Sequence, residues 1–463
     1  MSETKHRAPH RTIIEPFKIK VVEPLSRRTL EQREAILKRA GYNLFLVQSD
    51  DVTFDFLTDS GTTAMSAEQW GAMMVADESY AGSRSFQRFE KVVREVTGYP
   101  FVIPTHQGRA AERLLFSLLV KPGMKIPSNN HFDTTRANIE HMGGEAVDLV
   151  IDEGRDPESR HPFKGNVDLA RLDAFCAENR GRIPFGMLTI TNNTGGGQPV
   201  SLANIESASK IYRRHGIPFM LDACRFAENA YFIKLREEGF AAARVRDIAR
   251  GFFDLADGCL MSAKKDGLVN IGGFIALKSD EWLSNLRNQL ILTEGFPTYG
   301  GLAARDLEAL AVGLKEVLDE DYLEYRIAVS KYMADGLNRA GIQTMQPPGG
   351  HAVYIDAKAF LPHIPPGRFP GQALVCELYR LEGVRSCEIG SAMFGAFVDG
   401  AFRPAAMELV RLAFPRRVYT QSHFDYILEG MSALVARKTA IRGLRLTYDP
   451  PFLRHFTAQF EPV

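Results

Sequence analysis

Two adjacent lysines, Lys264 and Lys265, are the residues whose types and setting most directly suggest chemistry in this chain. They lie between two apolar runs, 257–261 and 273–277, which predict short buried strands joined by a tight connection. A lysine held at a strand end can form a Schiff base, because burial and a neighbouring cation lower its pKa until the neutral amine attacks a carbonyl. Ser262, just upstream, offers a hydroxyl that could hold a phosphate. Two adjacent lysines are more commonly a solvated charge pair, so the motif needs support from elsewhere in the chain.

A second candidate lies where a predicted strand, 101–104, runs through Gln107, Gly108 and Arg109 into a predicted helix, 110–120. The backbone N–H groups and the dipole of a helix start favour a bound anion, and the arginine adds a positive charge. Many such turns bind nothing, so this signal is weak alone. The chain lacks both the G-x-G-x-x-G and the G-x-x-x-x-G-K-[ST] patterns, which disfavours dinucleotide and P-loop nucleotide sites.

Two further predicted strands end in polar side chains. The strand 188–191 runs into a glycine-rich loop that contains Asn193, and the buried strand 217–221 is followed by Asp222 and, three residues on, by Arg225. A carboxylate at the end of an apolar strand needs a partner, because burying it alone is costly. Asp222 therefore either forms a structural ion pair with Arg225 or faces a protonated ring nitrogen, and the ion pair is the commoner arrangement for an isolated aspartate.

The elements that must position these residues alternate between strands and helices through residues 55–310. This alternation predicts a large domain with a mostly parallel sheet whose faces are covered by helices. Residues 311–463 mix helices with short strands, which indicates a smaller α+β domain. We expect residues 21–54 to join the smaller domain and residues 1–20 to form an N-terminal arm.

Two local patterns make sharper predictions before residue 55. The capping box that begins at Thr29 predicts a helix that ends at Gly41. The apolar run 45–47 predicts a short strand.

Composition limits the class of protein. The 463 residues include 56 Lys and Arg and 56 Asp and Glu, so the net charge is near zero, which disfavours nucleic acid and membrane surfaces as partners. The five cysteines are odd in number and form no C-x-x-C pair, so we expect free thiols in a reducing compartment and no zinc site. No apolar run is as long as a membrane span, and Met1–Lys20 lacks the apolar segment of a signal peptide. A cytoplasmic protein is the expectation.

The candidate residues therefore gather at strand ends, where parallel sheets bind ligands. Together they fit pyridoxal 5′-phosphate, a cofactor that needs a lysine for its Schiff base and an acid on its ring nitrogen. Lys265 would carry the Schiff base, and Asp222 would keep the ring nitrogen protonated. Asn193 and Arg225 would hydrogen-bond the phenolic oxygen of the ring, while the anion turn and the serine before the lysine pair would hold the phosphate. The residues alone do not choose between the two lysines.

Five motifs resemble those of the β-eliminating lyases, a family of pyridoxal-phosphate enzymes. They are Pro104–Arg109, Gly196–Ser201, Asp222–Lys234, Met261–Asp266 and Gly295–Gly301. The similarity extends from about Glu15 to the C-terminus. The resemblance implies an α/β protein with the type I, aspartate aminotransferase-like fold of pyridoxal-phosphate-dependent transferases. It also implies that Lys265 carries the cofactor, that Lys264 helps to bind it and that Phe132 stacks on its ring.

The resemblance also implies the reaction. The family catalyses β-elimination from L-tryptophan, which gives indole, pyruvate and ammonia, or from L-tyrosine, which gives phenol in place of indole. Three positions separate these branches, and here they hold Asp133, Ile389 and His455, as in the branch that cleaves tryptophan. The other branch has threonine, arginine and phenylalanine there. An arginine suits a phenolic oxygen, whereas an aliphatic side chain suits an indole face, and an aspartate could accept from the indole N–H. Without the resemblance, His455 would be interpreted as a surface histidine.

Further roles follow from the same resemblance. Arg411 would pair with the substrate carboxylate, assisted by Thr58 and Asn193, because an arginine fork matches a carboxylate. Tyr80 would reach the active site of a neighbouring subunit and help to protonate the leaving group. The expected assembly is a homotetramer of dimers that share active sites. The expected ligands of a monovalent cation, potassium, are Gly61, Glu78 and Asn270.

The chain also departs from the family. Asn193–Gly196 replaces a run of small residues, Cys224 stands where alanine or threonine is usual, and the segment 394–404 is shorter. The shorter segment lies near Ile389, so it affects the prediction for the pocket that holds the leaving group. Three alternatives remain open: a lyase for tyrosine or another amino acid, an aminotransferase of the same fold, and a non-catalytic regulatory protein. The last is disfavoured because the chain has neither a basic excess nor a DNA-binding segment.

Overall fold

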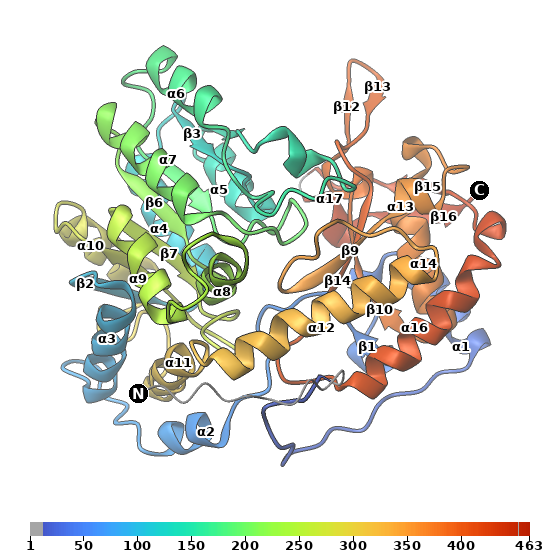
Figure 1. Ribbon diagram of the computed structural model, residues 1–463, viewed down its shortest axis with the longest axis horizontal. Coiled ribbons are helices and arrows are strands. Elements are labelled where there is room, and N and C mark those ends of the chain that lie inside the picture. The colour runs from blue at the N-terminus through green and yellow to red at the C-terminus, as the bar shows by residue number, and fades with distance from the viewer. Residues whose placement is uncertain (1–12, 452) are drawn as a thin grey trace.

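The computed structural model describes residues 13–451 and 453–463, so residues 1–12 of the expected N-terminal arm lie outside the described residues. Figure 1 shows two lobes, one built around β2 to β8 and the other around β9 to β16, with the long helix α12 (Glu320–Arg339) running from one to the other. The site described below lies where the two lobes meet.

A five-stranded sheet forms the centre of the first lobe, in the order β2-β8-β7-β6-β5. The pairs β5–β6 and β6–β7 are parallel, whereas β8 is antiparallel to both β7 and β2, so β8 alone runs against the other four. The prediction of a mostly parallel sheet is confirmed. The strands are β2 (Phe101–Thr105), β5 (Gly186–Thr189), β6 (Phe219–Asp222), β7 (Gly258–Ser262) and β8 (Gly273–Leu277). A parallel pair, β3 (Lys125–Ser128) and β4 (Glu145–Asp148), lies beside β5.

Successive side chains of these strands enter two different cores, one on each face of the sheet. Leu188 and Leu221 lie in the first core, while their neighbours Met187 and Met220 lie in the second. This alternation follows from the two-residue period of a strand, and it explains why every residue of β5, β6 and β7 is buried.

Helices cover both faces of this sheet. The first core receives side chains from α3 (Arg84–Thr97), α6 (Leu169–Glu178), α7 (Leu202–Arg214), α8 (Phe226–Arg236), α9 (Val245–Leu255) and α11 (Ala304–Glu316). The second core receives them from α4 (Gly108–Leu119), α5 (Asp133–His141) and α10 (Leu283–Thr293). In the part of the chain that the structure describes, no helix has both the length and the apolar character that a membrane crossing requires.

An antiparallel sheet in the order β11-β14-β9 forms the centre of the second lobe. Its strands are β9 (Ala352–Asp356), β11 (Cys387–Ile389) and β14 (Leu409–Ala413). The longer helices whose side chains pack in this core are α1 (Leu30–Arg39), α12, α14 (Pro370–Glu382) and α16 (Gln421–Val435).

Shorter elements complete the chain. The helices are α2 (Ala67–Met74), α13 (Ala357–Phe360), α15 (Ser391–Phe394) and α17 (Arg454–Thr457). The strands are β1 (Phe54–Asp55), β10 (Val384–Arg385), β12 (Ala396–Val398), β13 (Ala401–Arg403), β15 (Leu444–Tyr448) and β16 (Gln459–Pro462). The 3₁₀ turns are Leu44–Leu46, Ser49–Asp51, Asp152–Arg155, Pro366–Arg368 and Lys438–Ala440.

Of the two local predictions, one is confirmed and one is wrong. Thr29 caps α1 through a complete capping box, as predicted. The predicted strand 45–47 is a 3₁₀ turn instead. The side chain of Asn43 accepts a hydrogen bond from the backbone N–H of Phe45 and donates to the carbonyl oxygens of His455 and Ala458, so this segment is tied to the C-terminal tail rather than to a sheet.

The division of the chain at about residue 310 remains a proposal, and the cores support it. The cores of the first lobe draw their fully buried residues from between Phe89 and Ile327. The core of the second lobe draws them from 36–56 and 325–460. We propose that the two sets are the larger and the smaller domain and that α12, whose residues enter both cores, joins them.

Substitutions at two glycines can test how closely α11 packs on the loop that follows the lysine pair. A Cβ at Gly313 in α11 would lie 1.9 Å from the carbonyl oxygen of Gly267, whereas a Cβ at Gly251 in α9 would meet no described atom within 4 Å. We expect Gly313→Ala to cost about 1–3 kcal/mol of unfolding free energy through overpacking. Gly251→Ala should instead stabilise the helix by about 0.5–1 kcal/mol. Urea unfolding of the two variants measures the difference, and equal effects would contradict this packing.

Candidate active site

A pocket at the carboxyl ends of β5, β6 and β7 collects most of the residues that the sequence singles out. The predicted residues that line it are Thr58, Gln107, Gly108, Arg109, Phe132, Asn193, Asp222, Arg225, Ser262, Lys264, Lys265 and Arg411. A wider cavity between α1 and α14 is lined by none of them. The elements explain the gathering, because parallel neighbouring strands bring their carboxyl ends to the same edge of the sheet.

One end of the pocket is built to receive an anion. Gln107 is the N-cap of α4 but makes no capping bond with its side chain, and the Nζ of Lys264 lies 3.4 Å from its Oε1. Burial lowers the pKa of Lys264, and the nearby cations Lys265 and Arg109 lower it further. Gly108 must remain glycine, since a Cβ there would lie 2.6 Å from the Cβ of Ser262. A helix start, a hydroxyl and several cations form a cradle that fits a phosphate group.

Asp222 ends β6 and lines the pocket without an arginine partner. Its Oδ1 accepts a hydrogen bond of 3.3 Å from the backbone N–H of Cys224. Arg225 turns to Asp59 instead, with its Nε at 3.0 Å and its Nη2 at 2.6 Å from the two carboxylate oxygens. The sequence left two arrangements open for Asp222, an ion pair with Arg225 or a contact with a ring nitrogen. The ion pair is not formed. The Asp222 carboxylate is placed to face a group inside the pocket.

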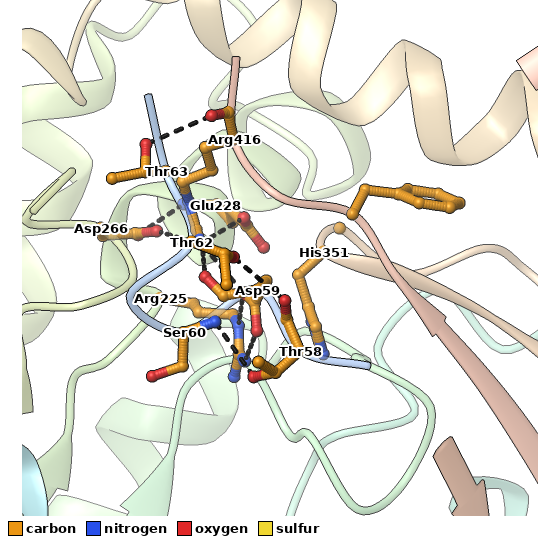
Figure 2. Close-up of polar contacts among 12 residues, drawn as sticks. Thr58, Asp59, Ser60, Thr62, Thr63, Arg225, Glu228, Asp266, His351 and Arg416 are labelled. Carbon is orange, nitrogen blue, oxygen red and sulfur yellow. Dashed lines mark hydrogen bonds and ion pairs between the residues drawn. The ribbon is translucent and has the colours of Figure 1, made fainter. Parts of the chain in front are cut away.

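Asp59 is a pocket residue that the sequence reasoning missed. Figure 2 shows it among Arg225, Arg416 and His351, with Thr58 beside it in the chain. Burial alone would raise the pKa of Asp59, but the charge of Arg225, and after it that of Arg416, holds this pKa well below its usual value. Asp59 is therefore an anion that fixes the guanidinium of Arg225 at the pocket wall. No local pattern signals this role, because the residues that it contacts lie far away in the sequence.

Asn193 is held by three donors at a single oxygen. Its Oδ1 lies 2.8 Å from the Tyr354 hydroxyl, 2.9 Å from His351 Nε2 and 3.2 Å from Arg411 Nη1. Burial, and after it the charge of Arg225, lowers the pKa of His351 well below its usual value, so this imidazole is neutral and donates from Nε2. The amide oxygen is thereby fixed toward these donors. The amide nitrogen is left to donate toward a ligand in the pocket.

Glu112 is a second pocket residue that the sequence reasoning missed. It lies one helical turn after Gly108 in α4, and its carboxylate accepts from the Thr135 hydroxyl at 2.5 Å and from Asn138 Nδ2 at 3.2 Å. Burial raises its pKa to about 7 against the hydrogen bond from Thr135, and the charge of Asp222 adds to the rise. The spacing of four residues from Gly108 is the signal that could have indicated it, because such residues share a helix face.

The residues predicted to surround the leaving group meet beside Phe132. Asp133 is the first residue of α5, and its Oδ2 lies 3.0 Å from the Nε2 of His455 in α17. Both side chains are buried, so the interpretation of His455 as a surface histidine is wrong. None of Asp133, His455 and Ile389 lines the pocket itself: Asp133 lies between the lining residues Phe132 and Thr134, and Ile389 lies in an apolar cluster with Met345 and Leu409.

The segment 394–404, which the resemblance predicts to be shorter than in the family, forms the hairpin β12–β13. Its turn residues Asp399 and Gly400 both have positive φ, 51° and 78°, as a tight hairpin turn requires. At its base, the carbonyl oxygen of Gly395 accepts a hydrogen bond of 2.7 Å from Arg454, which begins α17. The hairpin is thereby attached to the short helix that carries His455.

Tyr80 and the predicted cation ligands lie outside the pocket of their own chain. Tyr80 is 67% exposed and packs against the ring of Phe296, 5.3 Å between centroids. Asn270 Nδ2 donates to the Gly61 carbonyl oxygen at 3.0 Å, whereas Glu78 accepts from the backbone of α11 at Ala304. The three predicted ligands therefore do not form one site within a single described chain. Across residues 13–451 and 453–463, no three His, Cys, Asp or Glu side chains are grouped to bind a metal ion.

Comparison with known proteins agrees with this geometry. A family described as Beta-eliminating lyase matches residues 55–429. A tryptophanase of Hyphomonas neptunium is 59% identical over 451 residues, which cover 97% of this chain and 99% of that protein. A tyrosine phenol-lyase of Symbiobacterium sp. is 51% identical over 451 residues, which cover 97% and 98%. The solved structure of a Sphingomonas wittichii serine palmitoyltransferase matches 89% of this chain and 97% of that chain, with a TM-score of 0.58 and 13% identity. This likeness shows the fold, which is the predicted type I fold of pyridoxal-phosphate enzymes.

The raised pKa of Glu112 predicts a pH-dependent stability that one substitution should remove. A carboxyl with a pKa of about 7 in the folded protein and 4.5 in the unfolded chain binds its proton more tightly when folded. Its stabilising contribution is complete at low pH and is lost as the pH rises through about 7. Between pH 5 and pH 8 the unfolding free energy of the native protein should therefore fall, relative to Glu112→Gln, by about 2–3 kcal/mol.

Urea unfolding at the two pH values measures this difference. Glu178→Gln, at an exposed position that ends α6, is the matched control and should show no such pH-dependent difference. If the unfolding free energies of Glu112→Gln and of the native protein changed equally between pH 5 and pH 8, the raised pKa of Glu112 would be contradicted.

Proposed function

The chain belongs to the β-eliminating lyase family, and we propose that it is a pyridoxal 5′-phosphate-dependent carbon–carbon lyase that converts L-tryptophan and water to indole, pyruvate and ammonia. The observation that supports tryptophan as the substrate is the buried pair of Asp133 and His455. This pair lies beside Phe132, the residue expected to stack on the cofactor ring. The relative named tryptophanase supports it, at 59% identity against 51% for the one named tyrosine phenol-lyase. The second candidate, cleavage of L-tyrosine to phenol, is supported by relatives named tyrosine phenol-lyase, which are 48–51% identical to this chain.

The pocket residues fit the cofactor, as the anion cradle and the Asp222 carboxylate, which has no arginine partner, indicate. The phosphate would be held at the start of α4 by Gln107, Gly108, Arg109, Ser262 and Lys264. Asp222 would keep the ring nitrogen protonated, and Phe132 would stack on the ring. When bound, the cofactor supplies an electron-withdrawing ring that stores the charge left by removal of the α-proton.

The substrate would be oriented through its carboxylate. Arg411 is held by a hydrogen bond of 2.9 Å to the carbonyl oxygen of Leu57 and by its contact with Asn193, so its guanidinium is fixed before a substrate arrives. Arg411, Thr58 and Asn193 would then bind the carboxylate and present the Cα–H bond to Lys265. The Nζ of Lys265 would accept the α-proton. Fixing the geometry in advance lowers the entropy cost of reaching the transition state.

The leaving group must gain a proton at a ring carbon before indole can depart. Asp133 would accept a hydrogen bond from the indole N–H, and its charge would stabilise the positive charge that protonation creates on the indole. His455, 3.0 Å away, would hold the carboxylate in place. Ile389 and its apolar neighbours would support the pocket from behind. Tyr80 of a second copy would help to deliver the proton.

We extend the proposal to the assembly and the cation. A homotetramer of dimers would supply Tyr80 to a neighbouring site, and a potassium ion would bind between Gly61 and Asn270 of one copy and Glu78 of another. The exposure of Tyr80 supports this, as do exposed apolar side chains on the nearby elements of the lobe, Trp70, Met74, Ile271 and Leu292. Five free cysteines support a location in the cytoplasm.

The test of this function is product formation by the purified protein loaded with pyridoxal 5′-phosphate in potassium buffer. With L-tryptophan it should release indole and pyruvate in equal amounts. Lys265→Ala should lose at least about 10²–10⁴-fold in turnover, the range that a positioned proton-transfer group contributes. Lys264→Ala, its matched control, should keep turnover but need more cofactor. Undiminished pyruvate release by Lys265→Ala would refute the assignment.

The shared active site predicts complementation between two crippled variants. If Tyr80 serves the partner, a hybrid dimer of Tyr80→Phe and Lys265→Ala holds one site with both groups intact. Dissociating and reassembling an equal mixture should then restore about a quarter of native activity, because half of the dimers are hybrids with one intact site of two. Asp133→Asn mixed with Lys265→Ala is the control, since both residues serve the same chain's pocket. Equal recovery in the two mixtures, or none in the first, would contradict the shared site.

A further inference from the structure

Arg416 belongs to the second lobe and forms ion pairs with three acids of the first lobe. Its side chain is fully buried and lies three residues beyond the end of β14. Nη1 lies 2.9 Å from Asp59 Oδ2, and Nη2 lies 2.9 Å from both Glu228 Oε1 and Asp266 Oδ1. Figure 2 shows Arg416 among these three acids. The carbonyl oxygen of Arg416 also accepts from the backbone N–H of Ala64. One guanidinium therefore contacts acids from three separate segments.

Two of these acids lead directly to pocket residues. Asp59 holds Arg225 through two hydrogen bonds. Asp266 follows Lys265 in the chain, and its second oxygen accepts from the backbone N–H of Ala227 at the start of α8, at 2.8 Å. The loop that carries Lys265 is thus fastened between α8 and Arg416.

The same chain segment also carries the residue expected to bind the substrate carboxylate. Arg411 lies at the centre of β14, opposite Tyr354 of β9, and contacts Asn193 at the pocket. Five residues on, Arg416 contacts Asp266. One short segment of the second lobe, β14 and the three residues after it, therefore contacts the substrate end of the pocket at Arg411 and the support of the lysine loop at Arg416.

We propose that Arg416 is a positioning residue that couples the seating of the substrate carboxylate on Arg411 to the placement of Lys265 and Arg225. The proposal rests on the proposed function for the identity of the ligands. A shift of β14 when Arg411 takes up a carboxylate would be transmitted through the guanidinium of Arg416 to Asp266 and Asp59. An arginine is required because its planar fork bonds several oxygens in fixed directions, whereas the ammonium of a lysine is a single point charge.

The test uses Arg416→Lys, which keeps the charge and removes the fork, and compares it with Arg417→Lys. Arg417 is the adjacent arginine and pairs with Glu316 at 2.8 Å, away from the pocket, so it is a matched control. Two dissociation constants are measured from visible absorbance: that of pyridoxal 5′-phosphate from the apoprotein, and that of L-alanine, whose methyl group cannot leave, from the loaded protein. We expect both to rise about tenfold or more in Arg416→Lys and to stay within about twofold in Arg417→Lys.

A second variant separates positioning from general destabilisation. Asp266→Asn leaves Arg416 paired with Asp59 and Glu228 and should weaken L-alanine binding in the same direction. The double variant should be no worse than Arg416→Lys alone, because Asp266→Asn removes a contact that Arg416→Lys has already disrupted. If both constants of Arg416→Lys match those of Arg417→Lys, whether or not the unfolding midpoint changes, or if the effects of Arg416→Lys and Asp266→Asn add independently, the coupling is refuted. Absence of indole release with both constants still raised would refute the proposed function and leave the coupling intact.

Discussion

The interaction on which the site depends is the neutralisation of buried charge where the two lobes meet. Three arginines, Arg225, Arg326 and Arg416, face three acids, Asp59, Glu228 and Asp266, with hardly any solvent exposure. Burying such ions carries a desolvation cost that their attraction repays only when the geometry is good, so networks of this kind are poor evidence for stability. Their value here is geometric. Six charges that must all be paired allow few arrangements of the segments that carry them, and those segments bear Thr58, Lys265 and Arg411.

The network and the strand ends build the pocket together. The sheet brings Asp222 and Ser262 to one edge, because β5 to β7 are parallel; Asp222 pairs with Leu260, and β7 runs two residues further to Ser262. Helix α4 adds the anion cradle at its start and Glu112 one turn later. Glu112 then binds α5, the helix that begins beside Phe132 and carries Asp133. The residues assigned to the phosphate, the ring and the leaving group are therefore linked in one chain of contacts.

Much of this could be predicted from sequence because it follows local rules. Short apolar runs between glycines predict the central strands, and the polar residue after each run predicts what lies at the pocket edge; Asp222 and Ser262 are both where that rule puts them.

The rest could not be predicted, because long-range side-chain contacts decide it. Asp59 binds Arg225 across 166 residues, and Asn43 turns the predicted strand 45–47 into a 3₁₀ turn by bonding the C-terminal tail. Tyr80 and Glu78 lie outside the pocket of their own chain, so no argument from one chain can assign them to it.

The choice of leaving group is the central claim, and the buried pair of Asp133 and His455 is its physical basis. The direct measurement is kcat/KM for L-tryptophan and for L-tyrosine with the same loaded protein, following pyruvate and identifying indole or phenol. We expect a preference for tryptophan of at least about 100-fold, because a site that binds the indole N–H leaves a buried polar group unpaired when that partner is missing. Equal values, or a preference for tyrosine with release of phenol, would contradict it.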